Sequence, residues 1–212
     1  MRILVFGATG NVGRRVVAEA LARGHDVTAV LRDPDQAPDL LAGSTLRAGN
    51  AANADDVARL SNGQDLVISA TRPVTGNESD HATTAKALLD GLRVTGVRLL
   101  LVGGAGSLLA PDTGLPIVDD ARYVSPAWRA IAVACCDQYA VCKAEAETDW
   151  TYLSPPALLQ PGERTGSYRL GRDILLVDAE GRSAISMEDL AVALLDEAES
   201  PRHLRARFTV AH

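Results

Sequence analysis

Three glycines near the start of the chain have the spacing of a phosphate-binding loop. The segment GATGNVG places Gly7, Gly10 and Gly13 directly after the apolar run RILVF (residues 2–6) and before a helical pattern. A glycine pattern between a strand and a helix is more specific than the pattern alone. Gly7 would allow a tight turn, Gly10 would let a pyrophosphate approach the backbone, and Gly13 would let the helix lie close to the sheet. The helix amino terminus would then offer free N–H groups and a partial positive charge to that anion.

Two arginines directly follow this loop. Arg14 and Arg15 fall in the first helical turn, where each cation would oppose the helix dipole by about 0.3–1 kcal/mol. A bound anion would remove that penalty. The alternative is that Arg15 simply pairs with Glu19, four residues further along the helix.

The end of the next predicted strand (residues 26–31) bears on which dinucleotide would bind. An NAD site usually carries an acidic residue there, which binds the ribose 2′-hydroxyl. Positions 30–32 hold Val, Leu and Arg, so Arg32 is placed to contact a 2′-phosphate. Asp33 follows at once, and a solvated surface arginine is the alternative interpretation. We predict an NADP site with NADPH preferred, and NAD as the alternative cofactor.

Apolar runs and helical patterns alternate along the whole chain. Strands are expected at 2–6, 26–31, 44–47, 65–70, 98–104, 150–154, 174–178 and 207–210, and helices at 12–23, 55–60, 81–92, 127–148 and 187–198. Strands that are apolar throughout and separated by helices predict a parallel sheet covered on both faces. The expected class is α/β, a doubly wound parallel sheet of the NAD(P)-binding Rossmann type with small C-terminal additions. We expect one domain over 1–212, with a dinucleotide-binding core at about 1–155 and substrate-side elements at about 156–212.

Composition narrows the class of protein further. The 212 residues are 47% hydrophobic and 23% charged, and the net charge of −6 argues against nucleic acid as a partner. No apolar run approaches the ~20 residues needed to cross a bilayer, and the N-terminus does not read as a secretion signal. Cys135, Cys136 and Cys142 lack metal-ligand spacing and suit buried, reduced thiols. We therefore expect a cytoplasmic protein, monomeric or homodimeric, without a metal and acting on a small molecule.

Six stretches of the chain resemble one family: GATGNVG, RGHDVTAVLRDP, DLVISA, LLLVGGAGSL, DWTYLSPPALLQPGERTGSYRLG and ISMEDLAVALLDE. They run nearly the full length and are similar to atypical short-chain dehydrogenase/reductases. The nearest groups are the NmrA-like NAD(P)H-binding proteins and the NADH-flavin reductases, with biliverdin/flavin reductase more distant. The resemblance implies cofactor contacts at Gly7, Thr9, Gly10, Asn11, Val12, Gly13, Arg32, Ala70, Thr71, Gly103 and Pro155. It also implies that Pro155, after the strand at 150–154, lies near the nicotinamide.

Five further side chains are candidates for catalysis or substrate binding. Ser107 would orient the substrate or the carboxamide, or is an ordinary loop hydroxyl. His81 could deliver a proton, or is an exposed first-turn histidine without a role. Trp128 and Tyr123 could cover the site and stack on a flat ring, or pack in a core or lid. Arg164 could contact the substrate or brace its own loop.

The segment YAVCK has the Tyr-x-x-x-Lys spacing in which a lysine lowers a tyrosine pKa for proton transfer. Tyr139 lies about twelve residues past Ala127, or ~18 Å down the predicted helix, so we place it away from the active edge of the sheet. Hydride transfer to a flavin or quinone needs little acid–base help from the protein. We expect an NAD(P)H-dependent reductase of such a planar acceptor. The alternatives are a short-chain-type isomerase or ketone reductase of a biosynthetic pathway, and a non-catalytic NADP-sensing regulator.

Overall fold

The computed structural model describes residues 1–36, 41–74 and 76–212. Its main sheet consists of β1 (Arg2–Phe6), β2 (Asp26–Leu31), β3 (Thr45–Ala48), β4 (Leu66–Ser69), β5 (Arg98–Val102), β6 (Trp150–Ser154), β8 (Arg169–Gly171) and β10 (Ala206–Ala211). The helices are α1 (Gly13–Ala22), α2 (Ala54–Ser61), α3 (Asp80–Thr95), α4 (Arg129–Ala144) and α5 (Met187–Glu199), with 3-10 turns η1 (Pro34–Gln36), η3 (Ile117–Asp119) and η4 (Pro126–Trp128). Two short strands, β7 (Leu158–Gln160) and β9 (Ala184–Ser186), pair in parallel outside the main sheet.

The strand order is β3-β2-β1-β4-β5-β6-β10-β8, and every pair is parallel except β10 with β8. The chain winds outward in one direction from β1 to β3 and then in the other direction from β4 onward. This confirms the doubly wound α/β fold. In such sheets, ligands bind beyond the carboxyl ends of the strands where the winding direction changes, which here is between β1 and β4.

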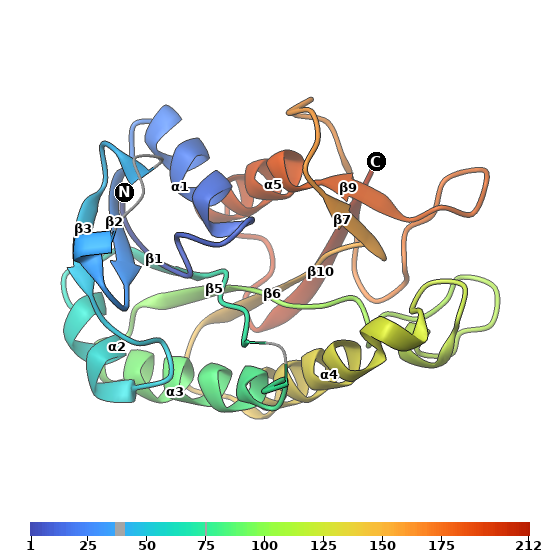
Figure 1. The fold of residues 1–212 in the computed structure, drawn as a ribbon, viewed down its shortest axis with the longest axis horizontal. Coiled ribbons are helices and arrows are strands. Elements are labelled where there is room, and N and C mark those ends of the chain that lie inside the picture. The colour runs from blue at the N-terminus through green and yellow to red at the C-terminus, as the bar shows by residue number, and fades with distance from the viewer. Residues whose placement is uncertain (37–40, 75) are drawn as a thin grey trace.

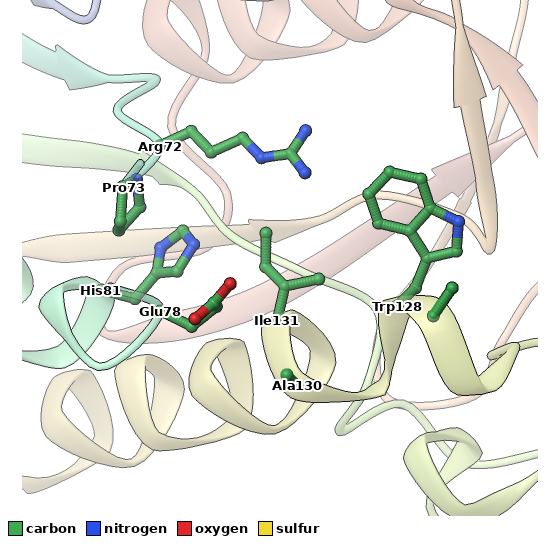
Figure 2. Close-up of a pocket in the computed structure, with 8 residues that line it drawn as sticks. Arg72, Pro73, Glu78, His81, Trp128, Ala130 and Ile131 are labelled. Carbon is green, nitrogen blue, oxygen red and sulfur yellow. The ribbon is translucent and has the colours of Figure 1, made fainter. Parts of the chain in front are cut away.

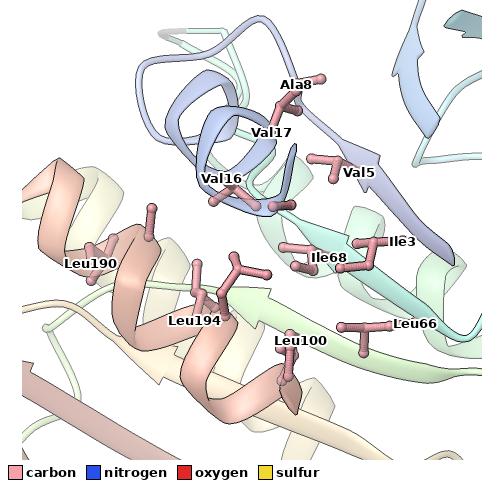
Figure 3. Close-up of a cluster of buried hydrophobic side chains, with 14 of the residues drawn as sticks. Ile3, Val5, Ala8, Val16, Val17, Leu66, Ile68, Leu100, Leu190 and Leu194 are labelled. Atoms are coloured by element: carbon pink, nitrogen blue, oxygen red, sulfur yellow. The ribbon is translucent and has the colours of Figure 1, made fainter. Parts of the chain in front are cut away.

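Helices cover both faces of the sheet (Figure 1): α1 and α5 lie on one side, and α2, α3 and α4 on the other. Side chains of β1 alternate between the two layers. Ile3 and Val5 pack toward α1 and α5, as Figure 3 shows, and Leu4 and Phe6 pack toward the opposite helices. Both faces of β1 are therefore buried, which explains why its sequence is apolar throughout.

Ion pairs hold α1 against α5. The guanidinium of Arg15 pairs with Glu188 in the first turn of α5, so the alternative pairing of Arg15 with Glu19 does not form. Glu19 is buried and instead binds Arg23 at 2.8 Å and Arg164 at 2.7 Å. The partner of Arg15 comes from a distant part of the chain because α1 and α5 run side by side.

The predicted strand at 174–178 is also wrong. Only Ile174 makes a bridge, to Leu109, and the remaining residues have no strand pairing. Leu175 is buried in a small satellite cluster with Leu108 and Ile117, so loop packing accounts for the apolar run. The strand that joins the sheet edge here is β8, which begins five residues earlier.

The predicted helix at 127–148 is shorter in the structure. Residues 126–128 form a 3-10 turn, and α4 ends at Ala144. The cap of α5 is confirmed, since the Ser186 hydroxyl accepts the Asp189 amide at 3.0 Å. Among the described residues, no helix combines the length and apolarity needed to span a membrane.

Candidate nucleotide-binding site

The turn between β1 and α1 has no room for side chains at two of its glycines. Gly7 has φ +77°, and a Cβ there would lie 2.6 Å from the Ala70 carbonyl oxygen. A Cβ on Gly13 would overlap the carbonyl oxygen of Gly7. Glycine at these positions lets the turn fold back on itself and lie against the end of β4.

The amino terminus of α1 can receive an anion. The Gly10 amide donates to the Gly7 carbonyl at 3.0 Å, which closes the turn. Within the part of the chain that the structure describes, the amides of Asn11, Val12 and Gly13 find no acceptor, and no side chain caps the helix. The first turn also holds no acidic residue. N–H groups without an acceptor and a favourable helix dipole are the donor set that a diphosphate requires, so the loop fits the cofactor that the sequence predicts.

The other predicted cofactor residues follow neighbouring strands at the same edge. Arg32 follows β2, Ala70 and Thr71 follow β4, Gly103 follows β5 and Pro155 follows β6. Because these strands adjoin β1 in the order β2-β1-β4-β5-β6, the residues form a row across the carboxyl edge of the sheet. A row of this kind suits an extended ligand lying across the strand ends.

Arg32 is exposed at the end of β2 and has no hydrogen bond or ion pair to any residue that the structure describes. The neighbouring Asp33 carboxylate accepts the Asp35 amide at 3.2 Å and so stabilises the following turn. The arginine side chain can therefore reach an anion beyond β2 without first breaking a contact with the described part of the protein.

Tyr152, which the sequence analysis did not single out, shapes the end of β5. It is fully buried, and its hydroxyl accepts the Gly104 amide at 3.1 Å and lies 3.0 Å from Gln138 Oε1. A Cβ on Gly103 would overlap its ring. Burial raises the pKa of Tyr152 well above its usual value, so it remains a neutral positioning group. The position of this tyrosine in the middle of a predicted central strand was the available signal.

His81 is buried, so the expectation of an exposed first-turn histidine is wrong. The start of α3 packs on α4, and this packing encloses the imidazole. Its Nδ1 lies 3.4 Å from Gln138 Nε2, and its Nε2 lies 4.0 Å from Cys135 Sγ. Burial, followed by the positive charge of Arg72, lowers the pKa of His81 below its usual value of 6.5. The ring is therefore neutral at pH 7, and the Gln138 amide N–H favours Nδ1 as the acceptor.

A small pocket of about 60 Å³ opens beside His81 (Figure 2). It is lined by Arg72, Pro73, Glu78, His81, Ala127, Trp128, Ala130 and Ile131. These residues come from the segment after β4, the start of α3 and the junction of η4 with α4. Trp128 is 58% exposed, and the Arg72 guanidinium carbon lies 5.5 Å from the centre of its ring.

The remaining predicted site residues lie outside this pocket. The Ser107 hydroxyl accepts Arg207 Nη1 at 2.8 Å. Tyr123 packs against the satellite cluster of Leu108 and Ile117. Arg164 makes two contacts with Glu19, at 2.7 and 2.8 Å. The structure thus brings His81 and Trp128 together but does not bring these three residues to them.

Tyr139 and Lys143 do not form an activated pair. The Tyr139 ring packs edge-on against Trp150, the first residue of β6, with ring centres 6.5 Å apart. The Lys143 ammonium lies over the face of the tyrosine ring, 5.7 Å from its centre. Burial raises the pKa of Tyr139, and the charge of Arg207 offsets this only in part. A catalytic tyrosine would need the opposite shift.

The cysteines are free thiols, and two of the three are buried. Burial raises the pKa of both Cys135 and Cys142 to about 12, so neither is a reactive thiolate at neutral pH. Among the described residues, no cluster of three or more His, Cys, Asp or Glu side chains is arranged to hold a metal ion.

Residues 7–201 match the model of the NAD(P)H-binding family, and the chain belongs to this family of nicotinamide-binding, oxidoreductase-type proteins with the Rossmann fold. It is 35% identical to the uncharacterized protein YwnB of Bacillus subtilis, over 99% of this chain and 98% of that protein. A solved structure of a candidate exported protein from Burkholderia pseudomallei superposes with a TM-score of 0.90 at 41% identity, with full coverage of both chains. A candidate NADH-flavin reductase from Streptococcus pneumoniae gives a TM-score of 0.88 at 29% identity, covering 100% of this chain and 99% of that one.

Proposed function

We propose that the protein is an NADPH-dependent reductase that passes a hydride to a planar acceptor such as a flavin or a quinone. The observation that carries this proposal is the cradle at Gly7–Gly13, whose free amides lie at the same edge as the ends of β4, β5 and β6. Membership of the NAD(P)H-binding family supports the nicotinamide cofactor.

In this proposal the amides of Asn11, Val12 and Gly13 hold the cofactor diphosphate at the start of α1. Arg32 binds the 2′-phosphate, which is the basis for preferring NADPH over NADH. Gly103 and Pro155, at the ends of adjacent strands, border the nicotinamide. When bound, the cofactor supplies a hydride from its nicotinamide ring.

The preference for a planar redox acceptor rests on the state of the candidate proton donors. His81 is buried with a lowered pKa, and Tyr139 is packed against Trp150 with a raised pKa. Neither side chain is poised to protonate an alkoxide at neutral pH. Flavins and quinones can instead take their proton from solvent after hydride transfer, so they fit a site with little acid–base chemistry.

The test is to mix purified protein with NADPH and one acceptor at a time, namely FMN, riboflavin and a naphthoquinone, and to follow the absorbance of the reduced nicotinamide. Steady oxidation well above the rate without protein is the expected result. A Gly10→Ala variant, which lacks the close approach for the diphosphate, serves as the control and should be slow with every acceptor.

Tight NADPH binding without turnover of any acceptor would contradict the reductase proposal and favour a nucleotide-sensing role. Turnover restricted to carbonyl substrates, and lost in Tyr139→Phe, would instead favour a ketone reductase.

A further inference from the structure

The small pocket beside His81 is lined by a positively charged group, Arg72, that makes no ion pair with the one carboxylate in the same lining, Glu78. Arg72 lies two residues after Ala70, beyond the carboxyl end of β4. Its side chain is exposed, and no ion pair joins it to any of the residues that the structure describes. Figure 2 shows its guanidinium extending over the pocket toward Trp128. Arg72 therefore lies next to the predicted cofactor residues Ala70 and Thr71, and its guanidinium is directed into the pocket.

The guanidinium lies against an aromatic ring and has no ion-pair partner among the described residues. The indole of Trp128 stacks near it at 5.5 Å, a distance that allows a cation–π attraction. Of the other charged or titratable groups lining the pocket, His81 is neutral at pH 7 because burial lowers its pKa. The Glu78 carboxylate accepts the Gly76 amide at 2.9 Å and makes no ion pair with Arg72.

The size of the pocket indicates what kind of group it can take. About 60 Å³ is far below the roughly 300–1,000 Å³ of a site that encloses a whole ligand. It is enough for a small substituent of a ligand whose remaining part would lie outside, over Trp128. A planar guanidinium with several N–H donors is the group that best matches a carboxylate or phosphate.

We propose that this pocket binds an anionic substituent of the acceptor, so that the preferred substrates are planar molecules carrying a phosphate, sulfonate or carboxylate. The inference rests on the proposed reductase function. Arg72 holds the anionic group, and the exposed face of Trp128 supports the adjoining ring.

The test compares matched acceptors that differ in charge: FMN with riboflavin, and naphthoquinone-2-sulfonate with naphthoquinone. Dissociation constants are measured by titration in the presence of saturating NADP⁺, so that no turnover is needed. We expect the wild type to bind the anionic member of a pair about tenfold or more tightly. In Arg72→Gln this preference should disappear, and in Arg72→Lys a large part of it should return.

Arg129→Gln is the matched control, because Arg129 lies next to Trp128, is exposed and pairs with Asp119 at 2.6 Å outside the pocket. It removes the same charge and should leave the preference unchanged. An equal preference in wild type and Arg72→Gln, or no preference for the anion in either pair, would overturn the inference. So would a matching loss of NADP⁺ affinity in Arg72→Gln, which would assign the arginine to the cofactor.

The same measurements distinguish a failure of the pocket assignment from a failure of the reductase proposal. If the anionic acceptors bind through Arg72 but NADPH is never oxidised, the pocket assignment stands and the reductase proposal fails. If both members of each pair are reduced with equal efficiency and bound with equal affinity, the reductase proposal stands and the pocket assignment fails.

Discussion

Replacing Gly10 by alanine should separate cofactor binding from folding. Gly10 is exposed, and its φ lies outside the left-handed region. A Cβ there would lie 3.2 Å from the Gly7 carbonyl oxygen and 3.9 Å from that of Ala70. This is a tight contact that a shift of a few tenths of an ångström relieves. Alanine also lowers the entropy of the unfolded chain, an effect worth about 0.4–1 kcal/mol in favour of folding.

We therefore expect the free energy of unfolding of Gly10→Ala to change by less than about 1 kcal/mol, which for a chain of this size is within ~4 °C in Tm. The effect on the cofactor should be larger. The added methyl group keeps the diphosphate from the helix amides, and each lost charge-assisted hydrogen bond costs about 1.5–3 kcal/mol, or roughly ten- to hundredfold in Kd.

The assay is a calorimetric titration with NADPH, accompanied by a thermal melt of the same sample. Gly13→Ala provides the contrast, because its Cβ would overlap the Gly7 carbonyl and should impair folding and binding together. A Gly10→Ala protein with native stability and an unchanged Kd would refute the assignment of the diphosphate to this loop.

Three further predictions address the cofactor choice, the unused tyrosine and acid stability. Arg32→Ala should weaken NADPH about ten- to hundredfold and leave NADH within about twofold; equal losses in titrations with both would show that the arginine does not bind a 2′-phosphate. Tyr139→Phe should keep kcat within about twofold, because the ring packs against Trp150 and Tyr152 of β6 and burial raises the pKa of its hydroxyl; a large fall in steady-state rate would contradict this structural role. Burial raises the pKa of Asp189, but hydrogen bonds, led by that from the Thr165 hydroxyl, outweigh it and leave the pKa lowered. The ionised Asp189 therefore contributes its full stabilisation above its unfolded-state pKa of about 3.9 and loses it as the pH falls through its lower folded-state pKa. The free energy of unfolding should fall less steeply from pH 5 to 3 in Asp189→Asn than in wild type. Equal slopes, measured by urea titrations across this pH range, would refute the prediction.

The central strands could be predicted from sequence because each is a short run of consecutive apolar residues. RILVF at residues 2–6 is apolar at every position after Arg2, and both faces of β1 are covered by helices. The same logic failed at 174–178, where an equally apolar run packs in a loop cluster. Conversely, β8 has little apolar signal, since it is an edge strand whose pairing with β10 depends on residues about forty positions away.

The glycine loop could be predicted for a similar reason, because the local turn itself requires its glycines. The burial of His81 and the partner of Arg15 could not be predicted, because the surroundings of both come from distant segments. The imidazole is enclosed by α4, and the guanidinium pairs with Glu188 of α5 rather than with its helical neighbour Glu19. Local spacing indicates which pairs are available, while helix packing decides which of them form.

The most direct test of the account is a crystal structure of the wild-type protein with NADPH. It should place the diphosphate within hydrogen-bonding distance of the Val12 and Gly13 amides, with the nicotinamide near Gly103 and Pro155. A nucleotide bound elsewhere on the chain, or none bound at saturating concentration, would contradict the proposed site and the reductase function together.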